Sequence, residues 1–214
     1  MSSERPRRGV MLVLSSPSGV GKTSLSRRLV ADHHDLDLSI SMTTRAPRPG
    51  EHHGREYFFT SPEAFEAEIA AGAFLEWAEL HGHHRSGTLK APVMASLAAG
   101  RDVMFDVDWQ GARAIAEAVP EDTVRVFILP PSLAEMVRRI RARAGDSEAM
   151  IHRRLETAME EFTKWGEYDY VIVNDDFDQA YAELAHIYHA ERLRRARNPW
   201  LAGFVDDLMR QPQS

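Results

Sequence analysis

The sequence predicts an α/β protein in which a parallel core sheet is flanked by helices and carries an inserted lobe with a small mixed sheet and a helical lid. Three observations predict this fold. Short apolar segments alternate with amphipathic segments of helical character, a glycine-rich run separates the first strand from the first helix, and two polar stretches interrupt the alternation. Alternating strands and helices are typical of parallel sheets, whose ligands bind at the carboxyl ends of the strands.

The core alternates strand and helix four times, and each short apolar strand is followed by an amphipathic helix. The strands are expected at residues 10–14, 102–107, 123–129 and 170–173, and the helices at residues 24–31, 110–118, 133–143 and 179–195.

Two segments break this alternation. Residues 39–92 are rich in Thr, Arg, Pro, Gly and His, with short aromatic stretches, and are expected to form the inserted lobe. Residues 141–157 are dense in arginine, and Gly145 can end one helix there while Asp146 or Ser147 caps the next, which is typical of a mobile lid. The expected division is a core at residues 1–38, a lobe at 39–92, a core at 93–140, a lid at 141–157, and a core with a C-terminal helix at 158–214.

The C-terminal stretch places Trp200, Phe204 and Leu208 at a spacing of four residues after Pro199. This spacing predicts a helix with an apolar face. We expect the helix to dock on the body by ordinary packing, or to contact another subunit; the sequence leaves monomer and homo-oligomer open.

Composition excludes several classes of function. The chain has 214 residues, 43% of them hydrophobic, which is enough for a sizeable core. The net charge of −6 argues against broad electrostatic binding of nucleic acid, and the lack of cysteine excludes disulfides, thiolate metal sites and a cysteine nucleophile. No apolar run approaches the roughly 20 residues of a membrane span, and the basic start is not followed by the apolar region of a signal peptide. We therefore expect a cytoplasmic protein that binds neither nucleic acid nor membrane.

Residues 16–23 carry the most informative motif, Ser-Pro-Ser-Gly-Val-Gly-Lys-Thr, between the first strand and the first helix. Small residues let backbone N–H groups surround phosphate oxygens, and the helix N-terminus adds partial positive charge. Lys22 can reach the outer phosphates, and the Thr23 hydroxyl can bind Mg²⁺. The residues expected to bind a nucleoside triphosphate are Ser16, Pro17, Ser18, Gly19, Val20, Gly21, Lys22, Thr23 and Ser24.

This loop departs from the usual pattern at one position. The pattern G-x-x-x-x-G-K-[ST] begins with glycine, where this chain has Ser16. Gly19, Gly21, Lys22 and Thr23 stand in register, so we interpret the run as a phosphate-binding loop. The alternative is a glycine turn that contains a lysine by chance.

A second motif lies in residues 41–51. Arg45 and Arg48 flank Pro47, which disfavours helix at the preceding residue, so both arginines are expected on a stiff loop. Arginine can bind phosphate through two parallel hydrogen bonds, and Ser41 and Tyr57 add hydroxyl donors. The alternative is a solvated basic loop.

Three carboxylates complete the set of candidate residues. Glu76 stands among bulky apolar residues, and Asp106 and Asp108 end the second core strand on one face of it. An aspartate at the end of a strand beside a phosphate loop is where an acid associated with Mg²⁺ is expected. The alternatives are a surface acid for Glu76 and helix or turn caps for the two aspartates.

Together these motifs resemble the guanylate kinase family. The matching segments run in family order over about residues 10–195: the phosphate loop, residues 41–51 with Tyr57, residues 74–77, 87–88 and 106–111, the arginine-rich lid, and residues 173–176. The resemblance implies a nucleoside-monophosphate kinase with a core, a GMP-binding lobe and a lid. It also implies that ATP and GMP are the substrates, that ADP and GDP are the products, and that Mg²⁺ accompanies ATP.

The resemblance assigns roles by position. For the GMP phosphate it implies Ser41, Arg45, Arg48 and Tyr57, with Glu51 and Gly87 nearby in the GMP site. For guanine it implies Glu76, Thr88 and Asp108, and carboxylate acceptors suit the N–H donors of guanine. For catalysis it implies Lys22, Arg45, Arg143 and Arg154, for the ATP base Asn174, and for Mg²⁺ Thr23 with Asp106, partly through water.

The chain departs from the family at residues 83–88, His-His-Arg-Ser-Gly-Thr, where the family usually has a Tyr-Tyr-Gly-Thr-like run. One residue is added and no tyrosine is present, so Arg85 and Ser86 are the candidates to replace a tyrosine that contacts phosphate.

Two other functions stay open from the sequence. One is a non-catalytic module that resembles guanylate kinase and binds proteins, although such modules degrade the phosphate loop. The other is a related kinase for another phosphorylated small molecule, which the altered run at residues 83–88 keeps open.

Overall fold

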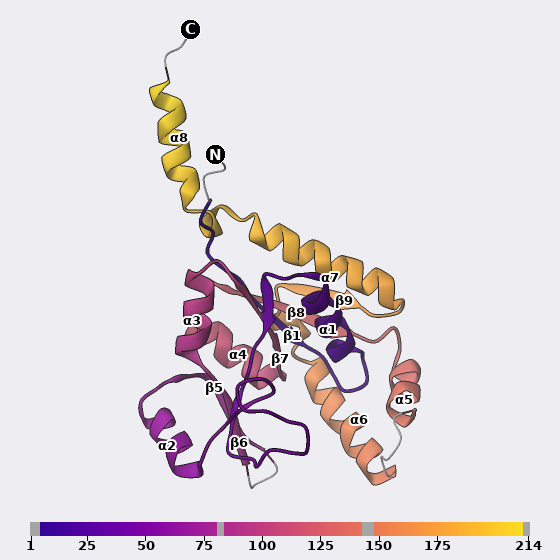
Figure 1. Ribbon diagram of the computed structural model, residues 1–214. Helices are drawn as coiled ribbons and strands as arrows, with labels where there is room; N and C mark the ends of the chain where they lie inside the picture. Colours follow the sequence, from indigo (N-terminus) through magenta and orange to yellow (C-terminus); the bar gives the residue numbers. More distant parts are fainter. Residues whose placement is uncertain (1–4, 81–83, 143–147, 212–214) are drawn as a thin grey trace.

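A five-stranded parallel sheet lies at the centre of the molecule (Figure 1). The computed structural model describes residues 5–80, 84–142 and 148–211. Every neighbouring pair of strands in this sheet is parallel. In order across the sheet the strands are β2 (Leu36–Leu38), β7 (Asp102–Asp106), β1 (Met11–Ser15), β8 (Thr123–Leu129) and β9 (Tyr170–Val173). The predicted fold class is confirmed.

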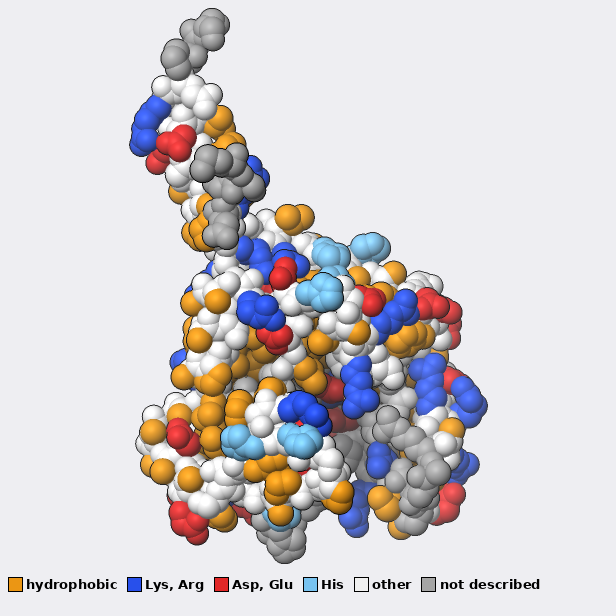
Figure 2. All heavy atoms as spheres, viewed as in Figure 1, with side chains coloured by type: hydrophobic (Ala, Val, Ile, Leu, Met, Phe, Trp, Pro, Cys, Tyr) orange, Lys and Arg blue, Asp and Glu red, His pale blue; other side chains and the backbone are white. Residues whose placement is uncertain are grey.

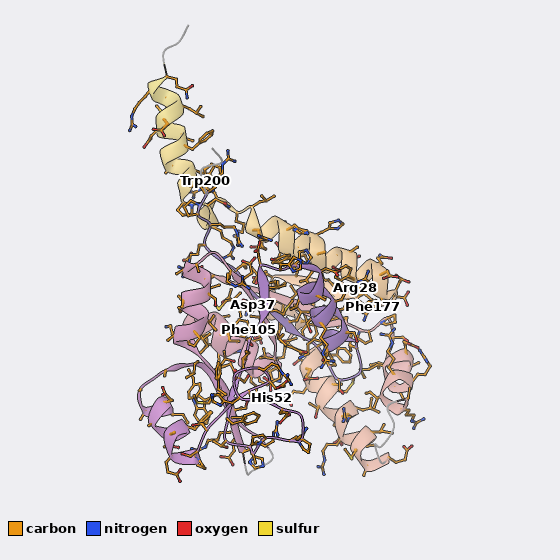
Figure 3. All side chains as sticks on the ribbon, in the orientation of Figure 1. Arg28, Asp37, His52, Phe105, Phe177 and Trp200 are labelled. Atoms are coloured by element: carbon orange, nitrogen blue, oxygen red, sulfur yellow. The ribbon has the colours of Figure 1, made fainter. Side chains whose placement is uncertain are left out.

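Helices cover both faces of this sheet because the side chains of β1 alternate between two apolar clusters. Leu12 and Leu14 belong to one cluster and Met11 and Val13 to the other, and all four are fully buried. The first cluster is completed by α1 (Lys22–Asp32), α5 (Leu133–Arg141), α6 (Glu148–Phe162) and α7 (Phe177–Arg192), and the second by α3 (Lys90–Ala98) and α4 (Trp109–Ala118). Phe105 of β7, labelled in Figure 3, lies in the second cluster.

A smaller sheet forms a lobe below the core in Figure 1. Its strand order is β4-β3-β6-β5; the first pair is parallel and the other two are antiparallel, so the sheet is mixed, as predicted. Its elements are β3 (Met42–Thr43), β4 (Phe58–Phe59), α2 (Pro62–Ala70), β5 (Phe74–Leu80) and β6 (His84–Leu89).

Several element boundaries differ from the sequence predictions. The predicted strand 102–107 ends at Asp106, and the predicted helix 179–195 lies at Phe177–Arg192, where the Asp176 carboxylate accepts from the Gln179 N–H and caps it. Short 3₁₀ turns follow α6 and α7, at Trp165–Glu167 and Arg195–Arg197. The predicted lid turn, with Arg143, Gly145, Asp146 and Ser147, lies outside the described residues.

The C-terminal helix α8 (Trp200–Arg210) does not dock on the body, so that expectation was wrong. None of its residues is buried, and it projects from the top of the molecule in Figure 1. Trp200, labelled at its base in Figure 3, contacts the Arg5 guanidinium, which lies 4.6 Å from the ring centroid. Phe204, Val205, Leu208 and Met209 stay about half exposed or more because no described segment covers them. No described helix is long and apolar enough to cross a membrane.

Candidate active site

The phosphate-type loop joins the end of the central strand β1 to α1. Gly19 and Gly21 have positive φ angles of 84° and 102°, which L side chains rarely adopt. A Cβ on Gly19 would lie 2.7 Å from Ile140, and one on Gly21 would lie 2.6 Å from the Asn174 amide. Both positions therefore require glycine, because of the backbone conformation and because a side chain would have no room. Ile140 of α5 and Asn174 after β9 pack against the outside of the loop.

Asn174 is buried and supports this loop. Its amide donates to the Val20 carbonyl at 2.7 Å, and Arg139 of α5 donates to the Asn174 carbonyl at 3.1 Å. The resemblance implied a place for Asn174 near the ATP base; its contact in the structure is with the loop backbone, and it does not line the cavity described next.

A cavity of about 280 Å³ opens at the loop. It is lined by residues Ser16 to Thr23, Asp106, Asp108 and Glu161. The loop backbone and the N-terminus of α1 give one wall positive character, and three carboxylates lie on the others. In Figure 2, acidic side chains lie within the hollow between the lobe and the α5–α6 helices, and basic side chains stand around its rim.

Lys22 and Thr23 converge on Asp106. Lys22 Nζ lies 2.7 Å from Asp106 Oδ1 and donates to the Val107 carbonyl at 2.7 Å. The Thr23 hydroxyl donates to Asp106 Oδ2 at 2.9 Å. A hydroxyl and a carboxylate beside a phosphate loop are oxygen ligands of the kind that Mg²⁺ prefers, so these residues fit the ion that the sequence predicted.

The helix α6 adds two charged residues to this region. Arg154 donates to the Ser18 hydroxyl at 3.0 Å, and Glu161, about two turns further on, lines the cavity. Sequence reasoning found Arg154 but missed Glu161. Arg143, the other predicted lid arginine, is outside the described residues.

A second cavity, of about 490 Å³, shares Asp106 and Asp108 with the first. The two cavities therefore meet at the carboxyl end of β7. Its remaining lining residues come from the lobe, from the end of β7 and from α4: Ser41, Tyr57, Glu76, Trp77, Ala78, Ser86, Val107, Gln110, Gly111 and Ala114.

Glu76 is the partly buried acid of this second cavity. Its carboxylate accepts a hydrogen bond of 2.7 Å from the Thr88 hydroxyl, and burial raises its pKa, with the nearby charge of Asp108 acting in the same direction. Asp108 also accepts from the Gly111 N–H at 2.8 Å and so caps α4, which was the alternative reading for this residue. Thr88 reaches the cavity only through Glu76.

The predicted arginine loop lies beside the second cavity, and neither of its arginines lines that cavity. Arg45 pairs with Glu51 at 2.9 Å, which lowers the pKa of Glu51, and the other Glu51 oxygen accepts from the Arg48 N–H at 2.7 Å. The Arg45 guanidinium also lies 5.2 Å from the centroid of the Tyr57 ring. Glu51 therefore organises the loop and holds Arg45 next to Tyr57.

Comparison with known proteins shows the family that the sequence motifs resemble. A model of the family described as "Guanylate kinase" matches residues 8–191. The chain belongs to the guanylate kinase family. It is 58% identical to a guanylate kinase of Caulobacter vibrioides over 209 residues, covering 98% of both chains. It is 55% identical to a guanylate kinase of Maricaulis maris, covering 96% of this chain and 94% of that one. The crystal structure of the Anaplasma phagocytophilum guanylate kinase superposes with a TM-score of 0.73 at 31% identity, covering 98% of this chain and all of that one.

Within this guanylate kinase fold, Arg85 and Ser86, the two candidates to replace the missing tyrosine, are neighbours on β6, and their side chains therefore point to opposite faces of the small sheet. Ser86 faces the second cavity, whereas the Arg85 side chain forms an ion pair with Glu66 of α2. Ser86 therefore occupies the position toward the cavity. Gly87, the next residue, is buried. A Cβ there would lie 2.6 Å from the Glu76 carbonyl and the Trp77 Cβ, so glycine allows β6 to pack closely on β5.

Proposed function

We propose that the chain is an active guanylate kinase, which transfers the γ-phosphoryl group of ATP to GMP, and to dGMP, in the cytoplasm. The observation that carries this proposal is that the phosphate-loop cavity and the cavity that holds the partly buried Glu76 share Asp106 and Asp108. ATP phosphates fill the first cavity and GMP fills the second, so the acceptor phosphate meets the γ-phosphate at the end of β7.

The proposed mechanism needs no general base. The second pKa of a phosphate monoester is about 6, so the attacking oxygen of GMP is already an anion at neutral pH. Catalysis consists of holding two polyanions in line and balancing the charge of the moving phosphoryl group. When bound with ATP, Mg²⁺ supplies positive charge at the β- and γ-phosphates, with Thr23 and Asp106 as the residues that hold it. Lys22, Arg143 and Arg154 supply the remaining positive charge from the protein.

The lobe supplies acceptor recognition in this proposal. Glu76 and Asp108 accept the ring and exocyclic N–H donors of guanine, and adenine lacks that pair of donors on the corresponding edge. Arg45, Arg48, Ser41 and Tyr57 hold the GMP phosphate. In the proposed division of the chain, residues 39–92 carry the acceptor and residues 141–157 bring arginines to the transferred group and exclude water.

The test is ADP formation from Mg-ATP with GMP, dGMP, AMP, CMP or UMP supplied separately. Turnover that is selective for GMP and dGMP would support the proposal. A folded protein that binds GMP but turns over no acceptor would be a binding module instead, and turnover with another acceptor would mean that the altered run at residues 83–88 had changed the substrate.

Replacing Lys22 with alanine tests the donor side. Loss of one preorganised charged donor commonly costs about 3 kcal/mol or more in the transition state, so kcat should fall at least about 100-fold. The thermal unfolding of Lys22→Ala should stay near that of the parent protein, since this side chain lies at the cavity and outside the apolar clusters. Near-normal turnover of the folded variant would exclude the assigned role.

A further inference from the structure

Glu161 faces the phosphate cavity because of its position on α6. Ile151, Arg154, Ala158 and Glu161 recur at spacings of three and four residues and share one face of this helix. Ile151 and Ala158 are buried in the core, and Arg154 donates to Ser18 of the loop. The same face therefore directs the Glu161 carboxyl group into the cavity, where it is half-buried.

The surroundings of this carboxyl group disfavour its charged form. Among the described residues, no hydrogen bond or ion pair holds it. Lys22 attracts its negative charge, whereas Asp108 and Glu160 repel it and Asp106 lines the same cavity. Burial is the largest effect, and together these influences raise the pKa of Glu161 to about 7.

A polyphosphate in this cavity adds negative charge directly beside Glu161. An ionised carboxylate would repel that charge, whereas a neutral carboxyl group carries one O–H that a phosphate oxygen can accept. Any bound polyanion must therefore raise the pKa of Glu161 further. The thermodynamic consequence is that binding of the anion and binding of a proton favour each other.

We propose that Glu161 is a further residue of the phosphate site: it takes up a proton from solvent when a polyphosphate enters the cavity and donates its O–H to a phosphate oxygen. No bond to phosphorus is made or broken in this step. The inference rests on the proposed function, in that the cavity at residues 16–23 receives the phosphates of a nucleotide.

The sign of the pH dependence follows directly. Above about pH 7 the free protein holds Glu161 mostly ionised, so binding must bring in a proton that becomes scarcer as the pH rises. The affinity for ATP should fall between about pH 7 and pH 9, by up to about tenfold per pH unit for one full proton. The terminal phosphate of the nucleotide titrates near pH 6, below this range.

The experiment is titration calorimetry with ATP in the presence of EDTA, at about pH 8, in two buffers that differ in ionisation enthalpy. The difference in heat counts the protons taken up on binding. The parent protein should take up more than about half a proton, because a group with a pKa near 7 is mostly ionised at pH 8. The Glu161→Gln variant should take up almost none and should lose the pH dependence of its affinity.

Two further variants separate this role from a structural one. Glu160→Gln changes the neighbouring exposed acid in the same way and should keep the proton uptake of the parent protein. Glu161→Gln can still donate through its amide and should keep ATP affinity within about threefold at pH 8, whereas Glu161→Ala cannot donate and should bind more weakly.

Equal proton uptake by the parent protein and Glu161→Gln would overturn the inference, as would ATP binding to the parent without proton uptake. Either result would leave the proposed kinase function standing, because ATP would still bind. Failure of the parent protein to bind ATP in EDTA would overturn the inference alone, because the proposed function is tested separately by ADP formation from Mg-ATP and GMP.

Discussion

At the scale of single residues, the two cavities hold carboxylates with very different partners. Asp106 has the Lys22 ammonium and the Thr23 hydroxyl on its two oxygens. Glu76 and Glu161 are both partly buried; Glu76 accepts from one neutral donor, and Glu161 has no hydrogen bond from a described residue. Burial raises the pKa values of Glu76 and Glu161. The two cavities therefore combine a carboxylate that is paired with a cation and carboxyl groups whose pKa values are raised by burial.

Glu76 should determine the choice of base in the proposed reaction. In Glu76→Gln the amide replaces an acceptor oxygen with a donor, which leaves a guanine N–H unpaired, so kcat/KM for GMP should fall about 10- to 100-fold. The KM for ATP should not change. The matched control is Glu79→Gln, on the same strand but exposed. Unchanged discrimination between GMP and AMP in Glu76→Gln would exclude the assignment.

The raised pKa of Glu76 adds a pH dependence to GMP binding. Only the ionised form accepts from both guanine donors, so GMP affinity should fall as the pH drops through the raised pKa. The fall should therefore begin at a higher pH than the ordinary range of a glutamate. Titration of GMP binding against pH in the parent protein and in Glu76→Gln measures this, and the variant should lack the dependence.

Two tyrosines at the start of β9, Tyr168 before it and Tyr170 as its first residue, offer a paired test of what a hydroxyl group contributes to stability. Tyr168 Oη is buried near Ser15 and hydrogen-bonds to no described residue, whereas Tyr170 Oη donates to Glu191 at 2.8 Å. Tyr168→Phe should leave the free energy of unfolding unchanged or raise it by about 1 kcal/mol, and Tyr170→Phe should lower it by about 1 kcal/mol. Urea unfolding of both variants measures the difference; equal losses would mean that Tyr168 is paired in solution.

At the scale of elements, a buried aspartate joins three parts of the chain. Asp102, at the start of β7, accepts from both terminal nitrogens of Arg7 at 2.7 and 2.9 Å, from the Val10 N–H at 2.8 Å, and from the Tyr188 hydroxyl of α7 at 2.8 Å. Its side chain is completely buried. The segment before β1, the strand β7 and the helix α7 are thus held at one point.

Removing this charge should be costly. Asp102→Asn leaves the Arg7 guanidinium, which is only 13% exposed, without its counter-ion, so the free energy of unfolding should fall by about 3–5 kcal/mol. The matched control is Asp37→Asn, because Asp37 on the neighbouring β2 also accepts two hydrogen bonds from an arginine, Arg101, but is about half exposed. That variant should lose no more than about 1 kcal/mol. Similar losses in the two variants would contradict the argument.

The elements that sequence reasoning found are those whose signal is local. The strands at residues 123–129 and 170–173 were predicted to the residue, because each is a short segment made mostly of apolar, β-branched and aromatic side chains. The strand β2 and the lobe strands β3 and β4 have two or three residues each, which is too short for a period to be recognised. The helices α2 and α3 were missed: α2 lies inside residues 39–92, whose composition indicated a lobe with a small sheet, and α3 crosses the predicted boundary between this lobe and the core.

The same distinction separates the site residues. Lys22 and Thr23 follow from a contiguous motif whose geometry is set by neighbouring residues. Glu161 could not be found in this way, because it reaches the cavity only through the packing of α6 against the loop. The choice between Arg85 and Ser86 depended on which of them faces the cavity, and that is set by the pairing of β6 with β3 and β5.

At the scale of the whole molecule, α8 is the one described helix that lies away from the body in Figure 1. Its apolar residues Phe204, Val205, Leu208 and Met209 are 45–80% exposed. The helix therefore contributes no core packing within one chain. Its contacts with the rest of the described chain include the stacking of Arg5 on Trp200 and Phe204.

Deleting residues 199–214 should change neither stability nor turnover. None of the residues of α8 is buried, so the deletion removes little packing. The melting temperature should therefore stay within about 2 °C of that of the parent protein, since a loss of 1 kcal/mol in stability lowers it by about 2–4 °C in a chain of this size. Thermal unfolding and GMP kinase assays of the shortened chain measure both. A fall of more than about 5 °C would mean that the apolar face is covered in solution, as in the subunit contact that the sequence left open.

The two ends of the core leave the molecule at the same place. The Arg8 N–H donates to the Arg197 carbonyl at 2.8 Å, just before β1 begins, whereas both cavities lie at the opposite, carboxyl end of the strands. Figure 1 shows both termini at the top and the lobe at the bottom. An enzyme attached to a bead or a sensor surface through either terminus therefore presents its substrate openings to the free solution. The same fixed end provides a reference point from which movements of the lobe can be recorded on single immobilised molecules.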